Sequence, residues 1–147
     1  MKVLLPALLA LALCAPKAAA GGWQQTPQSP QEREKQLQEY IDSEIERLEN
    51  LLKLESWQVF YVDSILNHDH RALQAELQGL SEAKVNNYDL YARSKDNWDE
   101  KIYQAFGKVF TQDQWKKYLK NGAAREKKAR DKRLGKFLKE SQEKGFK

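Results

Sequence analysis

Cysteine and histidine are scarce in this sequence, which has one cysteine, Cys14, and two histidines, His68 and His70, among 147 residues. Glycine and proline are also few, at seven and four residues. The sequence contains no Gly-rich phosphate loop, nucleophile elbow or Ser-His-Asp set. Its abundant Asp and Glu residues show no spacing that marks a catalytic pair. These absences argue against an enzyme, and we expect neither catalytic residues nor a bound cofactor.

The sequence also lacks an apolar run long enough to cross a bilayer, which takes about 20 residues. A basic start is followed by the short apolar run Val3 to Ala15, and Ala18 to Ala20 then offer small residues to a signal peptidase. We predict that residues 1–20 are a secretory signal cut near Ala20, which places the mature protein in the periplasm or outside the cell. A retained membrane anchor is the alternative, and the length of the run argues against it.

Lipidation at Cys14 is a further alternative, because lipoprotein signals also end at a cysteine. Leu13, directly before it, is larger than the residue that such a signal prefers. A cut after Ala20 leaves the mature chain with no cysteine, so that disulfide and thiol chemistry are excluded.

Beyond the signal, the sequence predicts one all-α domain, an elongated antiparallel bundle or hairpin of three to four helices. Residues 21–28, rich in Gly, Gln and Pro and containing Trp23, are predicted to be a flexible leader. Residues 29–140 form the predicted helical domain with a basic C-terminal extension, and residues 141–147 a disordered tail. Charged residues make up 31% of the chain, which suits thin helical packing with much exposed surface.

The first helix is predicted to start at Ser29, with Pro30 at its first position and Glu32 completing a capping box. Apolar residues then recur at steps of three and four, which gives one stripe along the helix. The stripe consists of Leu37, Ile41, Ile45, Leu48 and Leu52. The opposite, Glu-rich face is interpreted as solvated.

The second helix is predicted from about Ser56 to Leu77 or Leu80, with a break at Gly79 and Ser81 or, as the second candidate, at Asn86-Asn87. It is apolar on more than one side, which means that it meets more than one neighbour.

A third helix is predicted from Ser81 or Asn87 to Phe106, with Gly107 as a C-cap candidate. A fourth begins after Phe110, and Asn121-Gly122 either ends it or is tolerated within it. Residues 123–139 are helix-favouring but nearly all charged, and we expect them to form a frayed extension that faces solvent.

The start of the fourth helix carries a capping box in which Thr111 caps and Gln114 reaches back to the Thr111 N–H. Phe110, just outside the helix, and Trp115, at its fourth position, are placed to form a hydrophobic staple.

The start of the second helix repeats this plan. Leu54 lies outside, Gln58 is at the position that reaches back, and Val59 is the staple partner. Glu55 is a poor N-cap, so Ser56 is an alternative cap.

These two boxes, Leu54-Glu55-Ser56-Trp57-Gln58 and Phe110-Thr111-Gln112-Asp113-Gln114, resemble the LTxxQ motifs of the Spy/CpxP-like periplasmic proteins. Glu replaces Thr in the first box and Phe replaces Leu in the second. The resemblance covers about Gln31 to Lys136. It implies an all-helical, cradle-like dimer that acts in the envelope stress response and holds unfolded proteins without ATP.

Two groups of side chains are candidates for binding clients or partner proteins. One is aromatic, at the start of the second helix, and consists of Trp57, Phe60 and Tyr61. The other is basic, in the C-terminal extension, and consists of Arg125, Lys127, Lys128 and Arg130. Transient binding would combine apolar contact with charge attraction.

Charge is unevenly distributed along the chain. Residues 116–147 contain 13 Lys and Arg against 4 Asp and Glu, a net of +9, whereas residues 21–115 contain 10 against 17, a net of −7. We hypothesise that the acidic first helix pairs with the basic end, within one molecule or in a homodimer. The predicted secretory signal and the acidic residues within the basic run argue against nucleic acid as a partner. A solvated helix face, or contact with anionic lipid or acidic client proteins, fits this basic run better.

His68 and His70 are the only candidates for a metal site. Residues two apart on a helix point about 200° from each other, so both imidazoles cannot easily hold one ion, and we interpret them as surface or structural histidines. Metal sensing or resistance, known for relatives of the resembled family, is the second function class. A structural helical protein with one dedicated envelope partner is the third.

Overall fold

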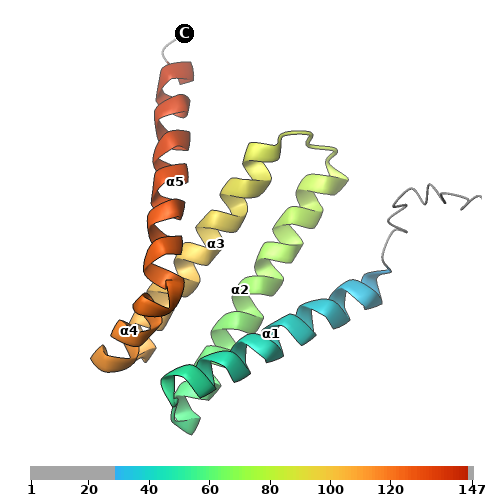
Figure 1. Cartoon of the computed structure of the whole chain (residues 1–147). Helices are drawn as coiled ribbons and strands as arrows, with labels where there is room; N and C mark the ends of the chain where they lie inside the picture. Colours follow the sequence, from blue (N-terminus) through green and yellow to red (C-terminus); the bar gives the residue numbers. More distant parts are fainter. Residues whose placement is uncertain (1–28, 146–147) are drawn as a thin grey trace, which may run out of the picture.

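The structure, a computed structural model, describes residues 29–145 and is all-α (Figure 1). The described part contains no β-strand, and its elements are α1 (Pro30–Leu52), α2 (Ser56–Glu82), α3 (Tyr88–Val109), α4 (Gln112–Tyr118), the π-helical segment η1 (Leu119–Ala123) and α5 (Ala124–Gly145). The predicted signal with Cys14, the leader with Trp23 and residues 146–147 lie outside the described residues. The expected fold class is therefore confirmed.

Helix α1 starts with the capping box expected from its sequence. The Ser29 hydroxyl accepts from the Glu32 N–H at 3.2 Å, and the Glu32 carboxylate accepts from the Ser29 N–H at 2.8 Å. These bonds satisfy donors that the first helical turn leaves free. The helix ends before Lys53, which adopts the left-handed conformation with φ 53°.

Helix α2 passes through Gly79 and Ser81, the first predicted break, and ends at Glu82. The second candidate, Asn86-Asn87, lies in the connection to α3. Glycine inside a helix costs backbone entropy. Nothing lies within 4 Å of the position that a Gly79 Cβ would occupy, so a larger residue would fit there. The chain turns only after Glu82, and α3 then starts behind Asn87, whose side chain accepts from the Asp89 N–H at 3.0 Å.

Helix α3 also runs further than predicted, to Val109 rather than Phe106. Gly107 is therefore inside the helix and is not its C-cap, a role taken by Phe110. A Cβ at Gly107 would lie 3.7 Å from the indole ring of Trp115, so this position lies against the aromatic side chain of the next helix.

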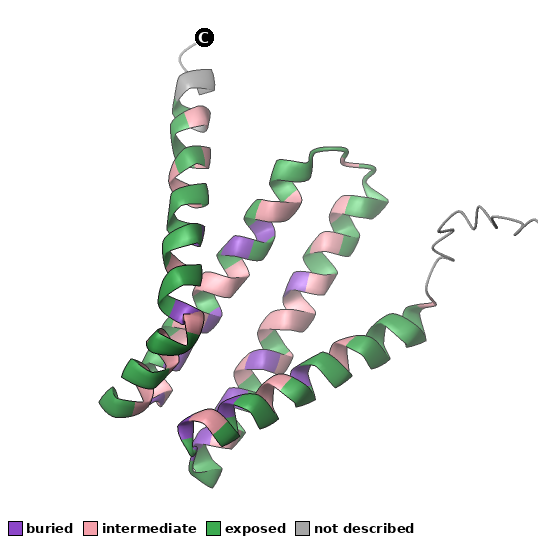
Figure 2. Ribbon diagram, viewed as in Figure 1, coloured by how far each residue is buried: buried purple, intermediate pink, exposed green. Residues whose placement is uncertain are grey.

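The helices α2 and α3 form a hairpin, with α1 packed against α2 and α5 against α3 (Figure 1). Figure 2 shows buried segments on all of these helices, with exposed turns at the top of the hairpin. The buried apolar side chains that form one cluster are Ile41, Leu48, Leu52, Leu54, Val62, Leu66, Ile102, Phe106 and Phe110. The core thus lies near the two connections α1–α2 and α3–α4.

The chain bends at Asn121 and Gly122, where the backbone leaves helical geometry and Gly122 has φ 113°. That conformation is open to glycine and strained for other residues. The bend turns α5 back along α3, where it makes contacts. Most side chains of α5 are exposed, as expected of this extension, but Lys127, Arg130 and Arg133 attach it to α3. The helix continues to Gly145, past the predicted end of the helical domain at residue 140.

Candidate protein-binding surface

The two helix starts singled out in the sequence meet in the structure through their glutamines. Gln58 Nε2 donates to Gln114 Oε1 at 2.7 Å, and Gln114 Nε2 donates to Gln58 Oε1 at 2.9 Å. We call this reciprocal contact the glutamine pair. The residues are 56 positions apart in sequence, so the pair fixes the start of α2 against the start of α4.

Each amide of the glutamine pair also closes its own helix start and reaches the end of another helix. Gln58 Oε1 accepts from the Glu55 N–H at 3.0 Å, and its Nε2 donates to the Val109 carbonyl at 3.0 Å. Gln114 Oε1 accepts from the Thr111 N–H at 2.9 Å, and its Nε2 donates to the Leu52 carbonyl at 3.4 Å. Every donor and acceptor of the two side-chain amides is thus used.

Burial makes this pairing consequential, because Gln58 is only 1% exposed and a buried amide without partners is costly. The sequence pointed to each glutamine as a helix-start residue but not to their mutual contact. The sequence feature that could have indicated this contact is that both glutamines occupy the same position in two similar helix-start boxes.

Aromatic packing supports the start of α4. Phe110 and Trp115 are the expected staple partners, and their ring centroids lie 6.5 Å apart. Trp115 further contacts Tyr103 at 4.9 Å and Tyr118 at 5.4 Å between centroids. Leu54, outside the other helix start, is buried in the core.

The aromatic candidates at the start of α2 are exposed and lie together. Trp57, Phe60 and Tyr61 expose 51%, 68% and 52% of their surface. Tyr61 contacts the other two edge-on, with centroids 6.2 Å from Trp57 and 5.7 Å from Phe60. The indole N–H of Trp57 donates to the Glu55 carboxylate at 2.7 Å. We call these three residues the aromatic cluster.

A groove that the sequence did not indicate lies where α1, α2 and α3 meet. Its volume is about 800 Å³, and its lining combines apolar side chains with a polar rim. Residues of α1 and α2 supply the apolar part, which consists of Leu37, Tyr40, Leu73 and Leu77. The apolar stripe predicted for α1 included Leu37, but the sequence could not show that this side chain, Tyr40 and Leu77 stay partly uncovered.

His70 borders this groove and packs edge-on against Tyr40, with centroids 5.2 Å apart. Burial lowers the pKa of His70, against a smaller opposing effect of Asp99. A more polar depression of about 310 Å³ continues toward α5, with Tyr118 and Arg130 in its lining. Burial raises the pKa of Tyr118 to about 12.

His68 lies apart from His70, as the helical spacing predicts. It is exposed, contacts Asp69 at 2.7 Å and has its ring 6.5 Å from that of Trp98. Among the side chains of residues 29–145 that the structure describes, no three His, Cys, Asp or Glu residues are grouped closely enough to hold a metal ion.

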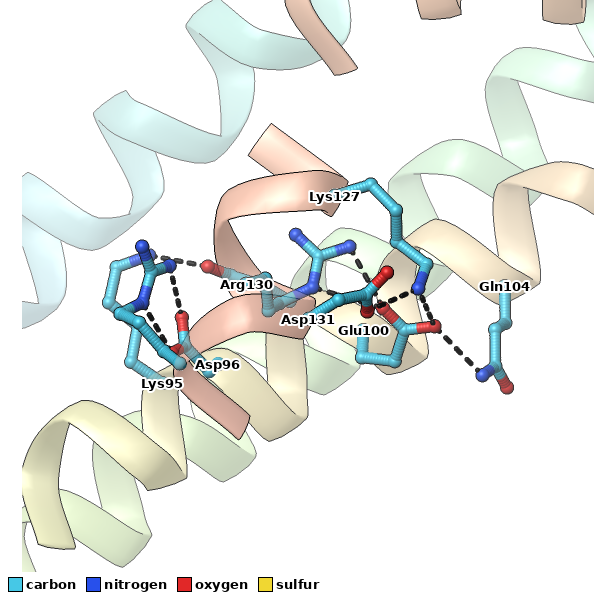
Figure 3. Close-up of polar contacts among 9 residues, drawn as sticks. Lys95, Asp96, Glu100, Gln104, Lys127, Arg130 and Asp131 are labelled. Atoms are coloured by element: carbon cyan, nitrogen blue, oxygen red, sulfur yellow. Dashed lines mark hydrogen bonds and ion pairs between the residues drawn. The ribbon is translucent and has the colours of Figure 1, made fainter. Parts of the chain in front are cut away.

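The basic candidates of α5 divide into two sets. Lys127 and Arg130 face α3, where Arg130 Nε donates to Glu100 at 3.0 Å and Lys127 Nζ lies 3.5 Å from the same carboxylate (Figure 3). Arg125 and Lys128 are exposed instead.

Arg133, which was not among the basic candidates, makes the closest contact between α5 and α3. It donates twice to Asp96, at 2.7 Å each, and Asp96 is only 3% exposed. The ion pairs that the structure gives between α5 and another helix reach α3, whereas the hypothesis of pairing within one molecule named the acidic first helix.

No helix in the stretch 29–145 is both long and apolar enough to cross a membrane. Comparisons with protein-family models, with curated protein sequences and with solved structures find no match.

Proposed function

We propose that this protein is a non-enzymatic envelope protein that binds unfolded or partner polypeptides, like the ATP-independent chaperones of the Spy/CpxP-like family that its two boxes resemble. Family membership, export to the periplasm and a homodimer are parts of this proposal. The observation that carries it is the aromatic cluster, three adjoining rings that remain at least half exposed.

Exposed apolar patches are found at sites of protein interaction, and aromatic side chains are enriched in such interfaces. The three rings of the aromatic cluster offer a large apolar area to a client segment while retaining a polar atom on Trp57 and on Tyr61. Arg125 and Lys128, both exposed, add charge attraction to acidic clients, which increases association rate more than affinity.

The experiment is a light-scattering assay of an aggregating client mixed with the purified mature protein. We expect equimolar protein to slow aggregation and the variant Trp57→Ser/Phe60→Ser/Tyr61→Ser to lose most of this effect. A matched control is Tyr88→Ser/Leu90→Ser, because Tyr88 is 88% exposed and Leu90 39% but neither belongs to the aromatic cluster. Circular dichroism verifies that both variants remain helical.

If the cluster variant still slows aggregation of the client, the aromatic cluster is not the client-binding surface. If the unaltered protein does not slow aggregation at all, the chaperone function is wrong, and a dedicated envelope partner becomes the better hypothesis.

No contact among the described residues favours the metal-binding alternative. Calorimetry with zinc, nickel and copper on the protein and on His68→Ala/His70→Ala tests it.

A further inference from the structure

The outward face of α5 carries an uninterrupted row of cations. Five exposed residues follow one another at helical steps of three and four, and they are Arg125, Lys128, Lys132, Lys136 and Lys139. At 100° per residue these side chains fall within one sector of the helix, and neither of the acidic residues between Arg125 and Lys139, Glu126 and Asp131, falls in that sector. By the same spacing, Glu143 lies in the sector only beyond the end of the row. We call this row the cationic stripe.

The structure sorts the basic residues of α5 by face. Lys127, Arg130 and Arg133 contact the carboxylates of α3, and their charges are compensated there. In the cationic stripe, by contrast, the only ion pair that the structure gives for these five residues joins Lys136 to Glu140, at 3.6 Å. The inner bases attach α5 to the bundle, and the attached helix presents the stripe to solvent.

The stripe is long, straight and purely polar. From Arg125 to Lys139 it extends about 21 Å, at 1.5 Å per residue. The apolar residues of this part of α5, Leu134, Phe137 and Leu138, fall on the opposite side of the helix by their spacing. A partner therefore meets a row of positive charge without an apolar side chain to insert.

We propose that the cationic stripe attaches the protein to anionic phospholipid headgroups at a membrane surface. A flat array of laterally mobile phosphates can match a straight row of cations along its whole length, and each Lys or Arg near such a surface is attracted to it. Single-stranded nucleic acid is less suited, because the stripe has no aromatic side chains for base stacking, and the predicted secretory signal directs the chain away from nucleic acid. This inference does not depend on the chaperone function.

The test is sedimentation of the full mature chain with vesicles of phosphatidylglycerol and phosphatidylcholine, and with vesicles of phosphatidylcholine alone. We expect binding to the anionic vesicles only, and weaker binding at 1 M salt, where the Debye length falls to about 3 Å. Each cation removed should weaken partition about fivefold, which corresponds to about 1 kcal/mol. The variant Arg125→Gln/Lys128→Gln/Lys132→Gln/Lys139→Gln should therefore lose about two to three orders of magnitude.

A control variant with the same net charge is Lys35→Gln/Lys108→Gln/Lys117→Gln/Lys120→Gln, because these four lysines are exposed on α1, α3, α4 and η1. It should retain most of the vesicle binding. Equal losses in the two variants would mean that net charge alone acts, and this would overturn the proposal. The proposal would also be overturned if the protein did not bind anionic vesicles. Parallel assays with duplex DNA and poly-glutamate would then show whether the stripe binds another polyanion or binds nothing.

Discussion

Removing the glutamine pair should destabilise the protein through two residues that are far apart in sequence. Gln58→Ala removes the contact to Gln114 and the bond to the Glu55 N–H, and it takes the amide donor away from the Val109 carbonyl. A buried polar group left without a partner costs about 1–3 kcal/mol, and loss of a helix cap costs about 1 kcal/mol. We expect the free energy of unfolding to fall by about 3 kcal/mol.

Gln114→Ala should cost about 2–3 kcal/mol, because it likewise opens a capping box and leaves the Gln58 amide without its partner. Both single variants destroy the same reciprocal contact. The double variant should therefore cost less than the sum of the two, with a coupling energy of about 1–2 kcal/mol. Urea unfolding followed by circular dichroism gives all four free energies.

A matched control uses a glutamine that is exposed. Gln78 donates to Glu82 at 2.7 Å four residues along α2, and such helix-surface pairs contribute about 0.2–0.5 kcal/mol. Gln78→Ala should therefore change stability little. Additive effects of Gln58→Ala and Gln114→Ala, or losses as small as that of the control, would refute the view that the two helix starts stabilise each other.

The other predictions concern the bend, the α5 attachment and pH. Gly122→Ala should lower the melting temperature, because alanine is strained at φ 113°, whereas Gly135→Ala, at an open helical position, should raise stability by about 0.5–1 kcal/mol. Asp96→Asn should cost about 1–3 kcal/mol and speed proteolysis within α5, which limited trypsin digestion would show. Because the pKa of Tyr118 is raised to about 12 from 10.0 in the folded protein, stability should fall as pH rises from about 10 to 12, and Tyr118→Phe should reduce this loss in urea titrations. Because the pKa of His70 is lowered from 6.5, the unfolded chain binds its proton first, so stability should fall as pH drops below about 6.5, and His70→Gln should flatten that change.

Local signals in the sequence predicted the helix starts well. The Ser29 and Thr111 boxes are present because hydroxyl caps and reaching-back side chains act within four residues of each other. The apolar stripe of α1 places Ile41 and Leu48 in the core, since helical spacing alone determines which residues share a face.

Features that depend on tertiary contacts could not be predicted from the sequence. Gly79 is a possible helix end by its own propensity, but α2 continues through it to Glu82, because tertiary packing of a helix can outweigh the propensity of a single residue. The attachment of α5 depends on the α3 carboxylates of Glu100 and Asp96, which are 27 to 37 positions away from their basic partners. The groove exists because α1, α2 and α3 leave Leu37 and Leu77 incompletely covered, which periodicity cannot reveal.

The glutamine pair also has a consequence for motion. It joins the α1–α2 and α3–α4 connections at one end of the molecule, whereas the first turns of α1 and the last turns of α5 point away from that end (Figure 1). The two side-chain amides therefore hold the helices together at this end of the bundle. Backbone hydrogen exchange should be slowest around this pair and quicken toward the first turns of α1 and the last turns of α5.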